Sequence, residues 1–385
     1  MTPSGDVVVI GGGAVGGAVA SAVLEDPAFE GRVIVIERDP TFRRASSALS
    51  AASIRQQFST PENIRMSQYS FGWLRDHVDV SLHEAGYLYL ATAAGARTLE
   101  ENVAIQRGEG ADIVLLTPTE LAARFPWLAL DGIALASLGL SGEGWFDGYA
   151  LVQALRTRAR DMGAELVTGE VVGMKLAAGS VVSVALADGA TIPCGTVVNA
   201  AGPWAREVAG MAGVDLPVEA RRRSVFVFEA RPDMQPGTSP LVIDTSGAWF
   251  RPEGGSFIAG IAPSPDEDLP DLPLEVDRDE FEARLWPALA ARVPAFDAIR
   301  LTNAWAGYYE VNTFDHNAII GRHPEIENLL FANGFSGHGI QQAPAVGRAL
   351  AELIVYGRYV TLDLSIFSFK RIAAGHAVIE RNVIG

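Results

Sequence analysis

Three glycines and one acid near the N-terminus have the spacing that binding of an adenine dinucleotide requires. Gly11, Gly13 and Gly16 follow the apolar run at residues 7–10, and Glu37 closes a second apolar run. The first glycine permits a tight turn, the second lets the backbone approach a pyrophosphate, and the third lets the next helix pack closely on the strand. That helix start offers N–H groups to phosphate oxygens, and Glu37 would accept hydrogen bonds from the ribose hydroxyls. The pattern predicts a dinucleotide-binding βαβ unit and leaves both FAD and NAD open.

Two further segments place small residues where the backbone could approach a cofactor. Residues 46–58 are mainly small, and Arg55 is their only charged side chain. Residues 334–339 read Gly-Phe-Ser-Gly-His-Gly and lie between an expected strand at 329–332 and a helix expected from about residue 343. Amides of the first segment could contact a phosphate or a flat ring, and the second segment is again a glycine turn between strand and helix.

The strands and helices that must position these segments can be predicted from the periodicity of apolar residues and from the turn residues between them. The region from residue 218 to 303 differs from the rest, because its strands surround acidic, proline-rich loops, and it indicates a second, mainly antiparallel layer. We expect strands at 7–10, 33–36, 87–92, 167–172, 181–186, 196–199, 224–229, 256–261 and 329–332, helices at 61–75 and 150–162, and a turn at 163–166.

Composition limits the class of protein and its partners. With 385 residues, 49% hydrophobic and 40 glycines, the chain is long enough for two domains with sizeable cores. A formal net charge of −16 argues against nucleic acid and anionic membranes as partners, because both carry negative charge. The single cysteine, Cys194, excludes an internal disulfide, and its apolar neighbours predict an inert buried thiol. The 6 histidines lack metal-ligand spacing, so we expect no metal site.

The N-terminal sequence predicts a cytoplasmic protein. The first strand is expected from about Asp6, which leaves no room for a targeting segment ahead of it. We find no apolar run of roughly 18 residues free of charges, so we expect no membrane span.

Seven motifs in chain order resemble the FAD-dependent amine and amino-acid oxidoreductases of the D-amino-acid oxidase superfamily, which include sarcosine oxidase, dimethylglycine dehydrogenase and glycine oxidase. The resemblance implies FAD and an α/β fold with a Rossmann-type FAD-binding domain at 1–85, 146–217 and 304–385. It also implies a discontinuous, mainly antiparallel substrate domain at 86–145 and 218–303. The motifs are the glycine fingerprint with Glu37, the small-residue segment with Arg55, Asp147-Gly148-Tyr149, the run 198–204, Trp249-Phe250-Arg251-Pro252, Trp305-Ala306-Gly307-Tyr308-Tyr309 and the run 333–339.

The same resemblance implies which residues bind the cofactor. The ADP half and the linker of FAD would be held by Gly11, Gly13, Gly16, Glu37, Arg38, Ser46, Ser47, Val172, Ala200 and Gly202. Residues Gly334, Gly337, His338, Gly339, Ile340 and Gln341 would run beside the flavin ring. Other cofactor-binding residues would be Ala14, Val15, Ala52, Ser53, Trp204 and Gly307.

The chemistry implied by the resemblance is oxidation of a C–N bond, in which hydride passes to flavin N5 and the imine is hydrolysed. A carboxylate on the substrate would need an arginine, and Arg55 occupies the position where sarcosine oxidases place one. Alternatively, Arg55 contacts a phosphate or lies at the surface. Tyr308, Tyr309 and Gln342 are candidates for lining the substrate pocket, although aromatic residues in such a run are commonly core. His338 is either a partial cation near the flavin or a structural histidine.

Departures from the family pattern narrow the activity. Tyr309 stands where glycine oxidases and D-amino-acid enzymes carry an arginine, which favours a secondary or tertiary amine over a primary one. Gly307 stands near the flavin-linking cysteine of monomeric sarcosine oxidases, and residues 46–54 contain no histidine for attachment, so we expect non-covalent FAD. The lysine that promotes reaction with oxygen is replaced by an apolar residue around Ile258. We therefore favour a dehydrogenase that passes electrons to another carrier.

Other functions stay open from the sequence. One is a D-amino-acid or glycine oxidase that uses oxygen, and another is a non-catalytic FAD-binding assembly factor. An NAD-dependent enzyme is disfavoured, because no second glycine fingerprint followed by an acid is present. A homo-oligomer or a partner subunit could complete the site.

Overall fold

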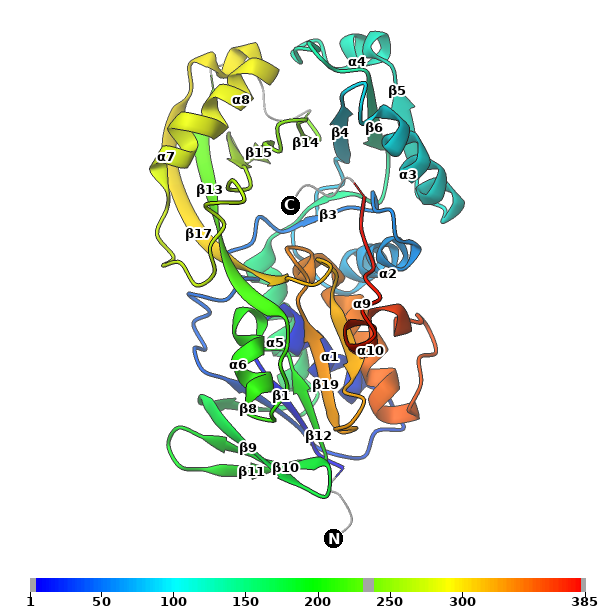
Figure 1. Cartoon of the computed structure of the whole chain (residues 1–385), viewed down its shortest axis with the longest axis vertical. Helices are drawn as coiled ribbons and strands as arrows, with labels where there is room; N and C mark the ends of the chain where they lie inside the picture. Colours follow the sequence, from blue (N-terminus) through cyan, green and yellow to red (C-terminus); the bar gives the residue numbers. More distant parts are fainter. Residues whose placement is uncertain (1–4, 231–238, 382–385) are drawn as a thin grey trace.

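The computed structural model describes residues 5–230 and 239–381, and two large sheets organise them. A six-stranded sheet lies in the lower part of the view in Figure 1, and an eight-stranded sheet lies in the upper part. This mixed α/β architecture confirms the predicted fold class.

The six-stranded sheet is the predicted dinucleotide-binding sheet, with strand order β18-β19-β12-β1-β2-β8. Strand β1 is buried along its whole length because it has parallel neighbours on both sides and its two faces contribute to two different hydrophobic cores. Only the edge strand β18 runs antiparallel to its neighbour. The strands are β1 (Val7–Ile10), β2 (Val33–Glu37), β8 (Glu165–Thr168), β12 (Thr196–Asn199), β18 (Ile319–Arg322) and β19 (Leu329–Asn333).

Small residues allow the helices of this sheet to pack closely. Helix α1 contacts both α9 and α5, and α9 also packs on α2. A Cβ at Gly347 of α9 would lie 2.6 Å from the backbone of Ala18 in α1, so the two helices cross at a distance that only glycine allows. The helices are α1 (Ala14–Glu25), α2 (Pro61–His77), α5 (Gly148–Asp161), α6 (Ala205–Gly210), α9 (Gly339–Tyr356) and α10 (Lys370–Ala373).

The eight-stranded sheet has the order β17-β13-β16-β15-β14-β4-β6-β5. All neighbouring pairs are antiparallel except β14 with β4, which agrees with the predicted mainly antiparallel layer. One face forms a phenylalanine-rich core beneath α4 (Pro118–Arg124) and α8 (Trp286–Arg292). The strands are β4 (Tyr87–Ala91), β5 (Ile113–Leu116), β6 (Leu135–Gly139), β13 (Val218–Glu229), β14 (Leu241–Ile243), β15 (Trp249–Glu253), β16 (Ser256–Gly260) and β17 (Arg300–Asn312).

Shorter elements complete the chain. The helices around the eight-stranded sheet are α3 (Ala96–Gly108), α4 (Pro118–Arg124), α7 (Arg278–Glu280), the π-helical turn Phe281–Leu285 and α8 (Trp286–Arg292). A three-stranded sheet consists of β9 (Val171–Ala177), β10 (Ser180–Leu186) and β11 (Thr191–Pro193), and a two-stranded sheet consists of β3 (Ser53–Ile54) and β7 (Gly144–Trp145). Short 3₁₀ turns lie at Gly202–Trp204, Pro294–Asp297 and Ser365–Phe367.

Three predicted element bounds are wrong. The strand expected at 224–229 is the second half of β13, which starts at Val218. The strand expected at 167–172 is two strands, because β8 ends at Thr168 and the chain leaves the six-stranded sheet before β9 starts at Val171. The helix expected from about residue 343 starts at Gly339. Its first turn is buried on all sides, so no alternation of apolar and polar residues marks it in the sequence.

The predicted division into domains stays a prediction. Strand β17 crosses the proposed boundary between residues 303 and 304, and it pairs with β13 along the whole of that strand.

In the described ranges, no helix combines the length and apolar character needed to cross a bilayer. Within the same ranges, no group of three His, Cys, Asp or Glu side chains is arranged to bind a metal ion.

The thiol of Cys194 is buried, and burial raises its pKa to about 11. At pH 8 only about one thiol in a thousand is then ionised, and the thiolate is the reactive form. We expect a thiol reagent such as dithionitrobenzoate to label Cys194 only after the protein unfolds. Labelling of the native protein within minutes at pH 8 would contradict this expectation.

Candidate active site

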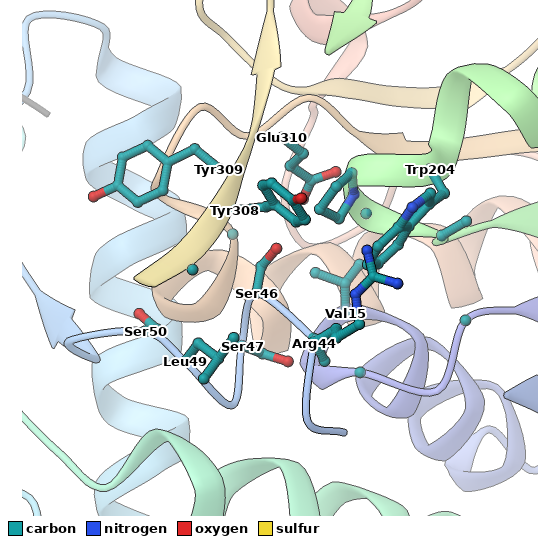
Figure 2. Close-up of a pocket in the computed structure, with 18 of the residues that line it drawn as sticks. Val15, Arg44, Ser46, Ser47, Leu49, Ser50, Trp204, Tyr308, Tyr309 and Glu310 are labelled. Atoms are coloured by element: carbon teal, nitrogen blue, oxygen red, sulfur yellow. The ribbon is translucent and has the colours of Figure 1, made fainter. Parts of the chain in front are cut away.

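A cavity of about 580 Å³ is lined by residues of both large sheets. Its walls come from the turn after β1, the small-residue segment, the 3₁₀ turn after β12, and strands β13 and β17. Figure 2 shows side chains of the small-residue segment and of β17 on opposite sides of this cavity. The predicted site residues that line it are Gly11, Gly13, Ala14, Val15, Glu37, Arg38, Ser46, Ser47, Ala200, Gly202, Trp204, Gly307, Tyr308, Tyr309, Gly337, Gly339 and Ile340.

The glycine turn after β1 cannot accommodate side chains. Gly11 has φ +101°, and a Cβ there would lie 2.3 Å from the Ala200 carbonyl oxygen. A Cβ at Gly16 would lie 1.8 Å from the Gly11 carbonyl oxygen. The N-cap residue of α1, Gly13, makes no side-chain capping bond, and the first turn of the helix carries no acid. The helix start can therefore accept an anion such as a pyrophosphate.

Glu37 connects this turn to the end of β2. One carboxylate oxygen accepts a hydrogen bond from the Gly12 N–H at 2.8 Å, and the other accepts one from the Asp39 N–H at 2.8 Å. Each oxygen has a second lone pair, so the carboxylate can still accept hydrogen bonds from ribose hydroxyls. The ribose-binding role of Glu37 stays a prediction.

Two arginines stack on Trp204 at the edge of the cavity. The guanidinium carbon of Arg38 lies 3.6 Å from the centroid of the indole ring, and that of Arg44 lies 5.5 Å from it. Figure 2 shows the guanidinium of Arg44 beside the Trp204 ring. Arg44 was not predicted, although its place two residues before the small-residue segment was a usable signal. With the glycine turn and Glu37, these cations make the cavity a chemical match for the ADP part of FAD.

Arg55 lies outside the cavity lining, in a buried cluster beside it. Arg55 is 4% exposed. Its Nη1 donates a hydrogen bond to the Tyr89 hydroxyl, and its Nη2 donates one to His338 Nε2 at 2.8 Å. Its backbone N–H donates to Gln341 Oε1 at 2.8 Å, and its Nε has no partner. Across residues 5–230 and 239–381, no carboxylate forms an ion pair with Arg55. The guanidinium therefore retains hydrogen-bonding capacity for an anion.

His338 is neutral in this cluster. Burial lowers its pKa well below the usual value, and the nearby charge of Arg55 lowers it further. A hydrogen bond with the Phe335 backbone raises the pKa, but by less. A neutral ring is also what the Arg55 contact requires, because Nε2 accepts the hydrogen bond. The idea that His338 supplies a partial cation near the flavin is therefore not supported at neutral pH.

The two tyrosines of β17 have different surroundings. Tyr308 packs edge-on against Trp204, and its hydroxyl donates to the Leu272 carbonyl at 2.7 Å. The ring of Tyr309 lies against Gly337, where a Cβ would come within 2.5 Å of it, and the Arg223 guanidinium carbon lies 5.2 Å from its centroid. In Figure 2 the two rings point to opposite sides of the strand, so the tyrosines cannot serve the same part of the site.

Some predicted residues lie behind the cavity wall. Gln342 donates to Asn63 Oδ1 at 3.1 Å inside the protein, which is a structural contact between α9 and α2. Val172 is 52% exposed and points away, whereas its neighbour Val171 lines the cavity. Besides Arg55, the remaining predicted residues that do not line the cavity are Gly16, Ala52, Ser53, Gly334, His338 and Gln341.

Glu143 anchors the segment that carries Arg55. Its buried carboxylate accepts hydrogen bonds from Gln56 N at 2.6 Å, from Gln57 N at 3.1 Å and from Tyr87 N at 3.2 Å. Burial raises the pKa of Glu143 to about 7, although these N–H donors oppose the shift. The carboxylate is therefore mainly ionised at pH 8.

Replacing Glu143 with glutamine is expected to destabilise the protein at pH 8. The amide NH₂ would face N–H donors that lose their acceptor, which costs about 2–4 kcal/mol. Urea unfolding measures the change. Glu84→Gln is the matched control, because exposed Glu84 accepts a single N–H, from Gly142 at 2.6 Å, which the amide oxygen can still accept. Equal stability of both variants would contradict the anchoring role.

Comparison with known proteins decides the family. The family model described as "FAD dependent oxidoreductase" matches residues 6–353. The chain belongs to this FAD-dependent oxidoreductase family. The predicted superfamily and the predicted cofactor, FAD, are thereby confirmed.

The relatives within the family are similar over most of the chain. FAD-dependent oxidoreductase domain-containing protein 1 of Xenopus laevis is 42% identical over 436 residues, which covers 100% of this chain and 87% of that protein. Dimethylglycine dehydrogenase, mitochondrial, of Rattus norvegicus is 27% identical over 91% of this chain and 43% of its own length. The crystal structure of L-proline dehydrogenase from P. horikoshii superposes with a TM-score of 0.87 and 29% identity, over 98% of this chain and 100% of that one.

Proposed function

We propose that this FAD-dependent oxidoreductase oxidises a C–N bond in a small amino acid whose nitrogen carries a further carbon substituent. The observation that carries the proposal is the buried Arg55 guanidinium, which has hydrogen-bond partners and no carboxylate. An unpaired buried cation is unfavourable, because burial removes its hydration. A substrate carboxylate would supply both the missing charge and an acceptor for the free Nε–H.

The residues of the chain would orient the substrate, and the chemistry needs little further acid–base assistance. Bound FAD supplies a hydride acceptor. Arg55 would hold the carboxylate, Tyr89 and His338 would fix the guanidinium, and the buried ring of Phe58, 4.7 Å from the guanidinium carbon, would exclude water. The resulting imine would hydrolyse to a carbonyl compound and an amine.

The choice of a substituted nitrogen is supported by Tyr309 and by the names of relatives. Tyr309 occupies the position of the arginine that glycine oxidases and D-amino-acid enzymes carry, so the residue expected with primary-amine substrates is missing. Among the relatives, dimethylglycine dehydrogenase and L-proline dehydrogenase are named after amino acids with a substituted nitrogen.

We further propose a dehydrogenase that contains non-covalent FAD. Ile258 is buried and apolar, and Arg251, its partner across the β15–β16 pair, is held by Glu253 and by the Ala51 carbonyl at 2.7 Å. A fixed, unpaired cation that would stabilise superoxide is thus missing at this position. Gly307 lines the cavity and has no side chain that could bond to the flavin.

Anaerobic mixing of the yellow protein with an amine panel tests the proposal. The panel contains sarcosine, dimethylglycine, L-proline, N-alkyl amino acids and D-amino acids, and flavin bleaching at about 450 nm is followed. We expect bleaching by the substituted amino acids and not by matched amines without a carboxylate. Slow recovery of colour in air would support a dehydrogenase. Bleaching by primary amino acids alone would contradict the substrate class, and no bleaching by any amine would favour an assembly role.

A further inference from the structure

Glu310 is a carboxyl group in the wall of the FAD cavity that no cation neutralises. It lies on β17 and is 8% exposed. One carboxyl oxygen accepts a hydrogen bond from the Gly334 N–H at 3.1 Å. Among the residues that the structure describes, no arginine, lysine or histidine forms an ion pair with it. Figure 2 shows Glu310 beside Tyr308, facing the same side of the strand.

The elements packed around Glu310 bring no compensating charge to it. Across the strand pair, β13 places Ala220 opposite Glu310, and the turn after β19 contributes the Gly334 N–H and Ser336, whose N–H donates to the Glu310 carbonyl. The 3₁₀ turn contributes Pro203 and Trp204 to the same cavity. The other charged residues that line the cavity are Glu37, Arg38, Asp39, Arg44, Glu170, Glu207 and Arg223.

The arginines of the cavity are engaged elsewhere. Arg38 and Arg44 stack on Trp204, and Arg223 forms an ion pair with Asp268 at 2.6 Å. Burial raises the pKa of Glu310 to about 8, and only the Gly334 N–H opposes this shift. The acid is therefore largely neutral at pH 7, and its O–H needs an acceptor.

FAD brings negative charge and many acceptor oxygens to this cavity. Its pyrophosphate carries two negative charges, which an ionised Glu310 in the same low-dielectric space would repel. A neutral carboxylic acid would instead donate a hydrogen bond to an oxygen of the dinucleotide. The two protonation states of Glu310 should therefore differ in their affinity for FAD.

We propose that Glu310 binds FAD as the neutral acid, so that at alkaline pH the binding of one FAD takes up one proton on this carboxyl group. The inference rests on the FAD binding of the family and is independent of the amino-acid substrate proposed above. It predicts that the affinity of the protein for FAD falls as the pH rises, because the ionised Glu310 must be protonated before FAD binds.

Titration of the FAD-free protein with FAD, followed by tryptophan fluorescence, tests the coupling. Between pH 7 and pH 9.5 we expect the Kd of the wild-type protein to increase, approaching about tenfold per pH unit at the upper end, as coupling to one proton requires. Glu310→Gln should bind FAD with a Kd that is nearly constant over this range, because the amide does not ionise and still offers an N–H donor.

Glu207→Gln is the matched control. Glu207 lines the same cavity but is exposed, so this variant removes one negative charge without removing the buried acid. We expect it to retain the pH dependence of the wild type. A wild-type Kd that does not change with pH, or a Glu310→Gln variant that keeps the wild-type slope, would overturn the proposal.

Calorimetry on the wild-type protein gives a test that needs no variant. FAD binding is measured in two buffers with different heats of ionisation, and the difference in binding enthalpy gives the number of protons taken up. We expect uptake near zero at pH 6.5 and an approach to one proton per FAD above pH 8. Equal enthalpies in both buffers at pH 9 would refute the coupling even if Glu310→Gln failed to fold.

Discussion

Replacing Arg55 with alanine is expected to weaken binding of the amino-acid substrate by roughly 10²- to 10³-fold, or about 3–4 kcal/mol, while the protein keeps its FAD. The reason is that the buried guanidinium has spare donors and no carboxylate partner of its own. Arg55→Lys should recover only part of the affinity, because an ammonium group cannot form the paired hydrogen bonds of a guanidinium. The substrate concentration at which the rate of anaerobic flavin bleaching reaches half its maximum measures the effect.

Stability distinguishes a substrate-binding role of Arg55 from a structural one. If the main role of Arg55 is to bind a substrate anion, its removal from the substrate-free protein loses only the hydrogen bonds to Tyr89 and His338 and the attraction to buried Glu143. Because the removal also eliminates a buried charge, the free energy of unfolding should fall by no more than about 1–2 kcal/mol. A structural arginine would instead lower the stability by several kcal/mol when replaced. Arg97→Ala is the control, because the side chain of Arg97 is 88% exposed and should affect neither property. Unchanged substrate affinity in Arg55→Ala would exclude the proposed role.

Replacing Gly16 with alanine is expected to abolish FAD binding and to lower the free energy of unfolding by about 3 kcal/mol or more. A Cβ at this position would lie 1.8 Å from the Gly11 carbonyl oxygen, so the helix start and the turn would have to separate. This is the turn that the pyrophosphate must approach. The flavin absorbance of the purified protein and its urea unfolding curve measure the two effects.

Gly72→Ala is the matched control for this substitution. Gly72 lies inside α2, and a Cβ there would meet nothing within 4 Å. Alanine should raise the stability by up to about 1 kcal/mol, because it has the higher helix propensity. A yellow Gly16→Ala protein with normal FAD affinity would show that the backbone can relax around the methyl group.

The nucleotide-binding part of the fold could be predicted because its signal is contiguous. The first strand, the glycine turn and Glu37 all lie within about thirty residues, and each has a local physical reason. The exact bounds of the strands and helices were harder to predict from the sequence. Val172 was predicted to bind the cofactor, but its side chain is exposed and that of Val171 lines the cavity, because successive side chains of a strand point to opposite faces.

The buried cluster around Arg55 could not be predicted from sequence spacing, because its members are distant in sequence. Arg55 and Gln341 are 286 residues apart, and Arg55 and His338 are 283 residues apart. Glu310 was missed for a different reason. A single acidic residue in a strand is normally predicted to be exposed. Glu310 is buried because the turn after β19 covers the end of β17.

The strand order of the six-stranded sheet has a consequence for the time at which the protein can acquire its cofactor during synthesis. Strand β1 begins at Val7, its neighbour β12 ends at Asn199, and β19, which pairs with β12, ends at Asn333. The ribosome must therefore have released most of the chain before the sheet under the cavity can close. Pairings over such separations also form slowly, since a large loop must close first. FAD is thus expected to join a completed chain and not a growing one.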